Sequence, residues 1–314
     1  MSITQPREIF KPFEYPKAEQ FAMQQHQAHW LHTEVQMGGD VQDWKVNLTD
    51  DERRLVGNVL KGFTQVEVYV GSYWGQMIPK WFPKPEIQLM GATFAAFEAI
   101  HALAYAHLNT TLGLEDFDAF LYEPTAKAKL DALIDDERDA ARSLAVYSAF
   151  AEGVSLFSAF SILMSFSQRN LLKGVGQIVS WSVRDESLHS RAGCWLFREL
   201  MKSHPELNTK QLEDDVYEAA NLTVALEHGF IDMCFDETPV ANVSPAHVRA
   251  LVNQRANAKL SELGYRPIFD VLADDLEAIA WFDRAAAGVE HSDFFAMRPT
   301  SYSKGHVDWE GAFA

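Results

Sequence analysis

The sequence predicts an all-α protein, a helical bundle built around a site for two metal ions. Almost no segment alternates in the way that β-strands do. Two Glu-x-x-His motifs, Glu98–His101 and Glu186–His189, stand in helix-like stretches, and Glu67 and Glu152 stand alone in apolar helical segments. Because residues i and i+3 share one helix face, each motif directs a carboxylate and an imidazole to one point. Four helices that supply four carboxylates and two histidines form a dinuclear metal site in helical bundles.

Capping residues and prolines delimit the first long helices. Thr49 and Glu52 have the spacing of a capping box, so a helix is expected to begin there and to run to Ile78. Prolines at positions 79, 83 and 85 then interrupt the chain, because proline lacks the N–H group that a helix interior needs. The expected helices cover residues 19–35, 49–78, 86–112, 123–149, 152–172, 176–203, 210–234 and 244–263.

The remaining breaks define a single domain and a tail. Gly38–Asp40 separates the first two expected helices, and Pro205 and Asn208 interrupt the chain before residue 210. An irregular segment is expected after Gly264, and a flexible tail from about Ser292. No internal repeat or low-complexity linker divides the chain. One all-α domain over residues 1–291, followed by a tail over residues 292–314, is the simplest organisation.

The surroundings of the glutamates indicate burial. Glu98 and His101 lie in a segment, Ala92–Tyr105, that is apolar around the whole helix, as buried helices are. Glu152 is followed by the apolar segment Val154–Phe166. A carboxylate is costly to bury unless its charge is compensated. A single Glu-x-x-His motif arises easily by chance, but two motifs and two buried glutamates together predict a dinuclear metal centre.

Composition and charge exclude several classes of protein. The chain has 314 residues, of which 47% are hydrophobic, and a net charge of −17 from 27 basic and 44 acidic residues. An acidic chain binds phosphate backbones poorly, so no nucleic-acid partner is expected. The N-terminus lacks the apolar core of a signal peptide and Val154–Phe166 is too short to span a bilayer, so a cytoplasmic protein without a membrane segment is expected. Cys194 and Cys234 are expected to be reduced core residues, although the sequence leaves a disulfide between them open.

The motifs resemble those of the small, radical-generating subunit of class I ribonucleotide reductase, and the likeness extends over nearly the whole chain. Val183–His189 matches the R-D-E-x-x-H motif of that family, Glu98–Tyr105 its E-x-I-H-x-x-x-Y motif, and Glu152–Gly153 its E-G segment. The resemblance implies a ferritin-like helical bundle with extra helices and a flexible C-terminal tail. The metal ligands that it implies are Glu67, Glu98, His101, Glu152, Glu186 and His189.

Four further residues are given roles by the resemblance. Tyr105 matches the tyrosine that holds a stable radical in many members, and its position four residues past His101 also places it near the metals; a core tyrosine with a bonded hydroxyl is the alternative. Asp185 matches the acid that orients a metal-bound histidine. Trp30 matches the near-surface tryptophan that starts the radical path, with a packing tryptophan as the alternative. Tyr302 matches the tyrosine in the tail that relays the radical.

The resemblance also implies two protein partners. The family binds its large, nucleotide-reducing subunit through the extreme C-terminus. Residues 307–314 hold two aromatic side chains, Trp309 and Phe313, in an acidic peptide that could become ordered in a groove of that subunit. An ordinary frayed end is the alternative. The second partner is another copy of the chain, since the resemblance implies a homodimer.

The implied function is radical initiation for ribonucleoside-diphosphate reductase. An oxidant would react at the reduced metal centre, and the oxidising equivalent would be held on Tyr105 or on the metals. It would then pass through Asp185, Trp30 and Tyr302 to a cysteine of the large subunit, where ribonucleotides become deoxyribonucleotides for DNA replication. The small subunit alone would therefore perform no chemistry on the substrate.

The metals are predicted to include manganese. Glu67 occupies the first ligand position, where most members have Asp, and some members with Glu there use manganese, alone or with iron, without a tyrosyl radical. Oxygen-rich sites suit manganese as well as iron. Phe160 matches the apolar pocket around the radical tyrosine, whereas Ser182 introduces a hydroxyl group. We therefore predict a dimanganese or manganese–iron centre that stores the oxidising equivalent on the metals, with a di-iron centre as the alternative.

Three other functions fit parts of the pattern. A stand-alone, ribonucleotide-reductase-like di-metal oxidase would share the six ligands but would need neither the radical path nor the aromatic tail. A ferritin-like iron store would need a cage-forming surface, which nothing in the sequence indicates. A helical protein without metal would be destabilised by its buried acids.

Overall fold

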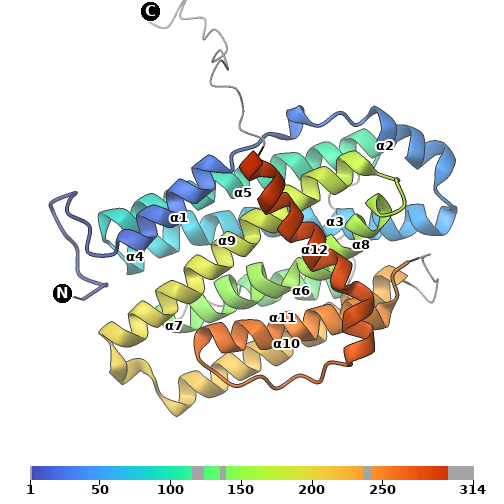
Figure 1. Cartoon of the computed structure of the whole chain (residues 1–314). Helices are drawn as coiled ribbons and strands as arrows, with labels where there is room; N and C mark the ends of the chain where they lie inside the picture. Colours follow the sequence, from blue (N-terminus) through green and yellow to red (C-terminus); the bar gives the residue numbers. More distant parts are fainter. Residues whose placement is uncertain (1, 115–123, 135–138, 236–241, 296–314) are drawn as a thin grey trace, which may run out of the picture.

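The described residues form a bundle of helices without a β-strand, which confirms the predicted all-α fold (Figure 1). The structure is a computed structural model in which residues 2–114, 124–134, 139–235 and 242–295 are described. Tyr302, Trp309 and Phe313 lie outside the described residues, so their predicted roles stay predictions.

The elements alternate long α-helices with short 3-10 and π-helical segments. In chain order they are α1 (Pro16–Gln27), the 3-10 helix η1 (His32–Glu34), α2 (Gly38–Gln42), the π-helix η2 (Asp43–Asn47), α3 (Asp50–Ser72), the π-helix η3 (Tyr73–Met77), α4 (Ile78–Trp81), α5 (Pro85–Leu112), α6 (Pro124–Ile134), α7 (Ala140–Ser143), the π-helix η5 (Leu144–Ser155), α8 (Phe157–Ser167), α9 (Lys173–Ser203), the 3-10 helix η6 (Pro205–Leu207), α10 (Lys210–Phe235), α11 (Pro245–Leu263) and α12 (Ala273–Phe295).

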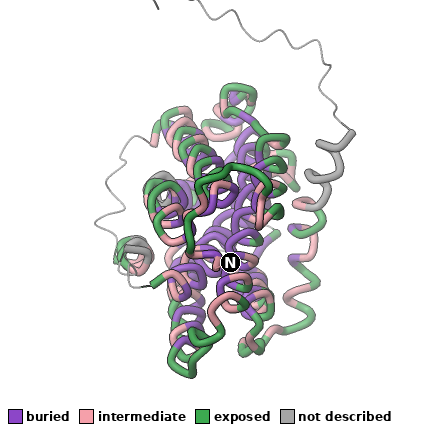
Figure 2. The backbone as a smooth tube through the Cα atoms, turned by 90° about the vertical axis from the view of Figure 1, so that its left-hand side faces the viewer, coloured by how far each residue is buried: buried purple, intermediate pink, exposed green. Residues whose placement is uncertain are grey.

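Two packed pairs of helices form the centre of the bundle. α3 packs along α5, and η5 packs along α9. α1 covers α5, α10 and α11 cover η5, and α12 crosses α9 and α11 (Figure 1). Buried residues concentrate in the inner helices, and exposed residues lie on the outer ones (Figure 2). The two pairs therefore enclose a buried interior to which each of the four central elements contributes one face.

Several predicted helix ends are confirmed. The capping box at the start of α3 is present, because Thr49 Oγ1 accepts from the Glu52 N–H at 3.2 Å and Glu52 Oε2 accepts from the Thr49 N–H at 2.9 Å. α5 covers the predicted 86–112 helix and ends at Leu112. The next residue, Gly113, has a φ of 76°, the left-handed conformation that favours glycine after a helix. Cys194 and Cys234 are buried and form no disulfide.

Several predicted boundaries are wrong. The break expected at Gly38–Asp40 is instead the start of α2, and the helix expected over residues 123–149 is interrupted at Asp139, the N-cap of α7. The first helix ends at Gln27 instead of continuing to residue 35, so Trp30 lies in a non-helical link. The break expected between residues 149 and 152 is absent, because η5 continues through Glu152 as a π-helix. The segment after Gly264 is irregular only to residue 272, and α12 then runs to Phe295, which makes the first four residues of the predicted tail helical.

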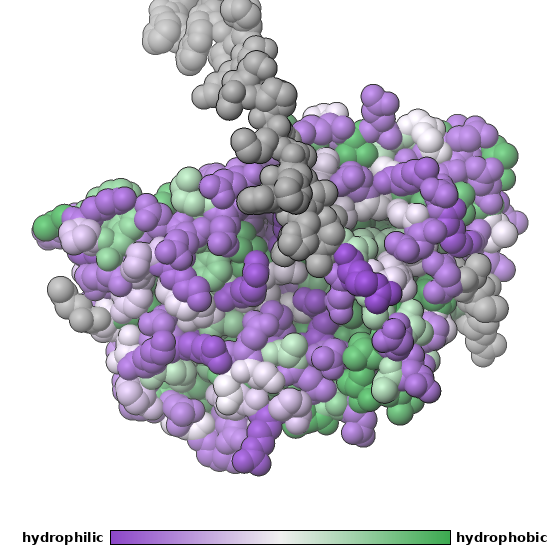
Figure 3. Space-filling model, viewed as in Figure 1, coloured by the Kyte–Doolittle hydropathy of each residue, from purple (hydrophilic) through white to green (hydrophobic). Residues whose placement is uncertain are grey.

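Two helical segments of the described chain are long and apolar enough to cross a membrane, judged by length and composition alone. Burial in the core explains the apolar composition of one of them. Of the most apolar window within Ala140–Ser167, 94% is buried inside the bundle, as in the core helix of a soluble protein. Only 50% of the α5 window is buried. The exposed side of α5 carries an apolar stripe of Leu89, Ala92, Ala96, Ala99 and Leu103. The face drawn in Figure 3, by contrast, is mostly hydrophilic, with small separate hydrophobic patches.

Candidate metal centre

The four central elements bring the six predicted ligands to one point in the interior. Each of these side chains is at most 1% exposed. They are Glu67 from α3, Glu98 and His101 from α5, Glu152 from η5, and Glu186 and His189 from α9. The spacing of three residues within each motif places its carboxylate and imidazole on the inner face of the helix.

The six side chains form two overlapping sets of four. Within each set, one nitrogen or oxygen atom per residue lies within 4.8 Å of the others. The sets are Glu67, Glu98, His101 and Glu186, and Glu98, Glu152, Glu186 and His189. Glu98 and Glu186 belong to both sets, so each of them could help to hold both metal ions. Each set then has one carboxylate and one imidazole of its own.

Both imidazoles are oriented by partners outside the cluster. His101 Nε2 lies 3.2 Å from Asp185 Oδ2, and His189 Nε2 lies 3.1 Å from Gln25 Oε1. The two Nδ1 atoms consequently face inward, 2.9 and 2.6 Å from the nearest carboxylate oxygens. A partner on the outer nitrogen that fixes the ring and its tautomer is the usual arrangement around metal-bound histidines.

The inward-facing atoms fit a pair of metal ions. Both oxygens of Glu67, and Oε2 of Glu152 and of Glu186, are buried without a hydrogen-bond partner among the described residues. Buried carboxylate oxygens without a partner are costly, so they require another source of positive charge. Four carboxylates and two imidazoles are a donor set that suits manganese or iron.

The cluster is electrostatically strained without metal. Burial, and next the charges of Glu186 and Glu98, raise the pKa of Glu67 well above its usual value. Burial and Glu98 likewise raise the pKa of Glu152 and of Glu186. Glu98 behaves differently, because the neighbouring histidines lower its pKa against the effect of burial. Carboxylates this close together repel one another, so they do not all ionise. Bound cations would allow all of them to be ionised.

We expect the metal-free protein to lose stability as the pH rises. The pKa values of Glu67, Glu152 and Glu186 are raised, so the folded chain binds these protons more tightly than the unfolded chain. The free energy of unfolding therefore falls as the pH rises above 4.5, the usual pKa of a glutamate. His101 acts in the same direction above 6.5, because hydrogen bonds to Asp185 and neighbouring glutamates raise its pKa although burial opposes this.

Thermal unfolding of metal-free and manganese-loaded protein across this pH range checks the expectation. Metal ions must displace the bound protons, so their affinity should rise with pH and loading should release protons into an unbuffered solution. A melting temperature of the metal-free protein that rises with pH above 6.5 would contradict the assignment of these groups.

Two residues that the sequence analysis missed also contact the cluster. Trp74, in η3, donates its Nε1–H to Glu152 Oε1, and Gln25, in α1, contacts His189. Both are fully buried. Trp74 stands seven residues after Glu67, two helical turns along the same face, so helix geometry could have found it. No sequence signal marks Gln25.

The π-helix that carries Glu152 is held from outside by α11. Arg255 Nε donates to the carbonyl oxygen of Gly153 at 2.8 Å, and its guanidinium lies 3.2 Å from the centroid of the Phe157 ring. A Cβ atom on Gly153 would lie 2.7 Å from Cε of the buried Lys259. Glycine therefore permits the close approach of α11 at the residue after Glu152, which explains the Glu-Gly pair noted in the sequence.

Tyr105 lies beside the cluster, as helix geometry predicts. It is fully buried, and its ring centroid is 6.3 Å from that of His101. Burial and the charge of Glu67 raise the pKa of Tyr105 well above its usual value, against a smaller opposing effect of the Ser182 hydroxyl. Ser182 is itself buried and donates to the carbonyl oxygen of Ile178 at 3.2 Å.

A chain of hydrogen bonds leads outward from the cluster. Trp30 Nε1 donates to Asp185 Oδ2 at 2.7 Å, and the same oxygen lies 3.2 Å from His101 Nε2. The structure thus brings these three predicted residues together. Trp30 is only 1% exposed, so its indole ring lies beneath the surface.

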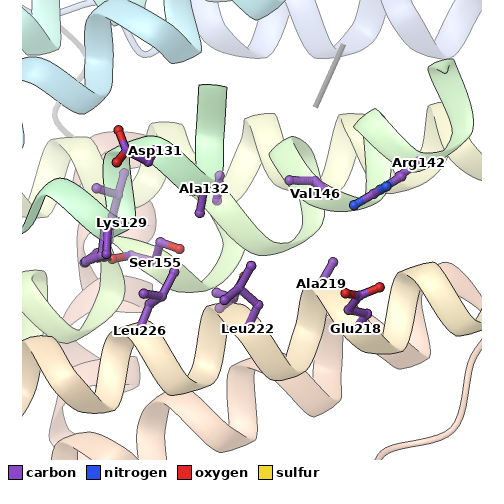
Figure 4. A pocket seen from close by; sticks show the side chains of 14 residues that line it. Lys129, Asp131, Ala132, Arg142, Val146, Ser155, Glu218, Ala219, Leu222 and Leu226 are labelled. Atoms are coloured by element: carbon purple, nitrogen blue, oxygen red, sulfur yellow. Dashed lines mark hydrogen bonds between the residues drawn. The ribbon is translucent and has the colours of Figure 1, made fainter. Parts of the chain in front are cut away.

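A separate surface pocket borders η5. It lies between η5, α6 and α10, and Ala151 and Ser155 line it together with Lys129, Leu222 and Leu226 (Figure 4). None of the six clustered ligands is among its described lining residues. The pocket therefore contacts the helix that carries Glu152 without opening onto the cluster.

Comparison with known proteins decides the family. The model of the family "Ribonucleotide reductase, small chain" matches residues 7–275. The chain belongs to the ribonucleotide reductase small-chain family. It is 32% identical over 332 aligned residues to the probable ribonucleoside-diphosphate reductase small subunit 048L of Invertebrate iridescent virus 3, covering 96% of this chain and 86% of that one. It is 26% identical to the ribonucleoside-diphosphate reductase subunit beta of Chlamydia pneumoniae, covering 90% of this chain and 86% of that one.

Solved structures of the family share the fold. The ribonucleotide reductase R2 subunit from Clostridium botulinum superposes with a TM-score of 0.79 at 16% identity, covering 87% of this chain and 89% of that one. The dimanganese(II)-NrdF of Streptococcus sanguinis superposes with a TM-score of 0.75 at 21% identity, covering 88% of this chain and 98% of that one. The ferritin-like architecture predicted from the motifs is therefore confirmed.

As a member of this family, the protein is the small subunit of a class I ribonucleoside-diphosphate reductase. Its dinuclear metal centre generates and stores the oxidising equivalent that the large subunit uses to reduce ribonucleotides to deoxyribonucleotides. The matched relatives support this function and not the stand-alone oxidase considered from the sequence.

Proposed function

We propose that the six clustered residues bind two metal ions that include manganese, and that the oxidising equivalent is stored on the metals. The observation that carries this proposal is Glu67, whose two buried oxygens lack a hydrogen-bond partner among the described residues. With Glu67, four of the six ligands are carboxylates, and oxygen donors suit manganese. The similarity in fold to a dimanganese(II) protein supports the same reading.

The protein's own residues would divide the work of holding the metals. When bound, the metals supply one-electron redox chemistry. Glu98 and Glu186 would help to hold both metals, because both residues belong to each set of candidate ligands. Asp185 and Gln25 would keep the imidazole rings oriented through their contacts with the outer nitrogens. The buried interior would exclude water and unwanted reductants.

The surroundings of Tyr105 favour storage on the metals. Forming a neutral tyrosyl radical requires the hydroxyl proton to leave to an acceptor. The Ser182 hydroxyl directs its own hydrogen to the Ile178 carbonyl, which is not a base. A proton given to Ser182 would therefore have no onward acceptor along that route, which disfavours oxidation of Tyr105.

The radical path would begin along the hydrogen-bonded chain of His101, Asp185 and Trp30. It would continue through Tyr302 in the C-terminal tail, with Trp309 and Phe313 as anchors in the large subunit. Removing residues 302–314 tests the tail. Turnover with the large subunit should be lost while metal content stays unchanged, whereas retained turnover would contradict the proposed docking.

The exposed apolar side of α5 favours a homodimer as the assembled state. Leu103 is 60% exposed, and Val68 on the adjacent helix α3 is 56% exposed. Contiguous apolar surface of this kind is usually covered in the assembled protein. A mass of two chains in sedimentation would agree with a dimer, and a Leu103→Glu variant should then sediment as one chain.

A cytoplasmic location without membrane or nucleic-acid partners is consistent with the buried reduced cysteines and the net charge of −17. Cell fractionation would check the location directly.

Elemental analysis joined to electron paramagnetic resonance tests the metal assignment. The protein is expressed with both metals supplied, purified and activated with oxidant. We expect manganese, alone or with iron, at about two metal ions per chain, with a metal-centred signal and no tyrosyl signal. Two irons with a sharp tyrosyl signal would overturn the proposal and make Tyr105 the storage site.

A further inference from the structure

Two cations from other helices hold the end of η5 that carries Glu152. η5 ends at Ser155, and the last carbonyl oxygens of a helix have no N–H partner within it. The carbonyl oxygen of Gly153, next to Glu152, accepts from Arg255 Nε at 2.8 Å. The carbonyl oxygen of Ser155 accepts from Lys129 Nζ at 3.2 Å. Positive charge is favourable at the C-terminal end of a helix, so both contacts stabilise this turn.

Arg255 also contacts the helix that follows. Its guanidinium lies 3.2 Å from the centroid of the Phe157 ring, and a cation over an aromatic face is an attractive contact. Phe157 is fully buried and is the first residue of α8. α11, on which Arg255 stands, packs against both η5 and α8. Arg255 therefore fixes the junction between the two helices from the side away from the metal cluster.

The carboxylate of Glu152 is held from the inner side. Trp74 Nε1 donates to its Oε1, whereas its Oε2 has no hydrogen-bond partner among the described residues. Trp74 is fully buried, and its ring packs edge-on against that of Phe94 with the centroids 4.8 Å apart. Because the tip of the side chain is held in this way, the place of Oε2 in the cluster depends on the backbone turn that Arg255 holds.

Glu152 serves only one of the two sets of candidate ligands. It belongs to the set that contains His189, whereas Glu67 and His101 belong to the other. A displacement of the turn at Gly153 should therefore weaken one metal position and leave the other intact. Loss of general stability would have no such preference.

We propose that Arg255 is a positioning residue for one of the two metal positions, the one to which Glu152 contributes. Its hydrogen bond to the Gly153 carbonyl and its contact with Phe157 hold the turn that places Glu152 Oε2 beside the other ligands of that set. Arg255 is not itself one of the clustered ligands. This inference rests on the proposed function, in which the six clustered residues bind two metal ions.

Titration of the metal-free, full-length protein with manganese(II) tests the assignment, with the resonance signal of the free ion as the readout. Arg255→Met removes the donor and the charge but keeps an unbranched, adaptable side chain. We expect it to weaken one of the two binding steps by about 10- to 100-fold, the range for groups that orient a ligand. Arg249→Met is the matched control, because Arg249 also stands on α11 but pairs with Asp232 at the surface. Both of its binding steps should stay near wild type.

Combination with ligand variants distinguishes positioning from general destabilisation. If Arg255 acts through Glu152, Arg255→Met should have little further effect on manganese affinity in a Glu152→Gln background. In a Glu67→Gln background, which removes a carboxylate of the other set, it should still weaken the remaining position. Wild-type binding in Arg255→Met would overturn the proposal. Equal weakening of both steps would also overturn it, as would the same loss with and without Glu152.

Hydrogen exchange of the metal-free protein separates this inference from the proposed function. Arg255→Met should speed amide exchange at the end of η5 and the start of α8 but not along α5, because the opening is local. Arg249→Met should leave all three regions unchanged. Unchanged exchange around Gly153 in Arg255→Met would refute the inference whatever metals bind. A wild type that binds no manganese, together with faster exchange in Arg255→Met, would instead count against the proposed function alone.

Discussion

Glu186→Gln should abolish turnover with the large subunit and prevent the binding of two metal ions. The substitution keeps the shape of the side chain and removes its charge. Glu186 belongs to both sets of ligands, so both metal positions lose a carboxylate together. Changes just outside a metal site typically cost about 10- to 100-fold in affinity or activity, and the loss of a shared ligand should exceed that range. Metal content and turnover are the two measurements.

The same substitution should stabilise the metal-free protein. Burial and the nearby Glu98 raise the pKa of Glu186, so ionised Glu186 opposes folding when no metal is present. A neutral amide of the same size removes the cost of burying that charge beside the other carboxylates. We therefore expect metal-free Glu186→Gln to melt above the metal-free wild type, and manganese to raise its melting temperature much less.

Glu199→Gln is the matched control for this prediction. Glu199 stands on the same helix, and its carboxylate pairs with Lys202 near the surface at 2.7 Å. Such surface pairs contribute little to stability, so metal content, turnover and melting temperature should all stay near wild type. Two tightly bound metals in Glu186→Gln would show that Glu186 is not needed to hold both metal ions.

The residues of the candidate metal centre could be predicted from the sequence because their signal is local. A spacing of three residues within an apolar helix fixes both the common face and the burial of a Glu–His pair. The same reasoning located Tyr105 one turn beyond His101. What the sequence could not show is the overlap of the two ligand sets, since that depends on how α3, α5, η5 and α9 pack.

The elements that were predicted wrongly are controlled by distant contacts. The first helix ends early where Arg184 Nη2 donates to the Ala28 carbonyl oxygen at 2.6 Å and Asp185 accepts from Trp30. The two partners are 156 residues apart in the first contact and 155 in the second, so no local sequence pattern predicts either contact. The helix α12 was missed because its apolar signal is short: Ile279 and Phe282 are its buried hydrophobic residues in the described part.

The π-helical form of η5 has a similar origin. Its sequence suits an ordinary helix, and the wider turn is a rare form that is often found at functional sites. Arg255 and Lys259 of α11 contact the turn at Gly153 from one side, while Glu152 faces the cluster. Neither contact can be inferred from residues 144–155 alone. The sequence therefore placed Glu152 in the predicted site but did not predict the form of the helix that positions it.

Asp185→Asn should lower turnover with the large subunit by about 100-fold while the metals stay bound. Asp185 Oδ2 contacts both Trp30 Nε1 and His101 Nε2, so the carboxylate joins the metal cluster to the first residue of the proposed radical path. Although burial opposes it, hydrogen bonding to His101 lowers the pKa of Asp185, which keeps the carboxylate charged. The amide preserves the shape but cannot take a proton from either partner.

A double-variant cycle with Trp30→Phe distinguishes a shared path from two independent defects. If Asp185 and Trp30 act in series, each single variant should lose about the same turnover, and the double variant should lose little more. Metal content and the metal-centred resonance signal should stay near wild type in all three proteins, because none of the six ligands is changed. Losses that multiply in the double variant would mean that the two residues affect turnover separately. Loss of metal in Asp185→Asn would mean that the carboxylate serves mainly to orient His101, and the path from the cluster to Trp30 would then have to avoid it.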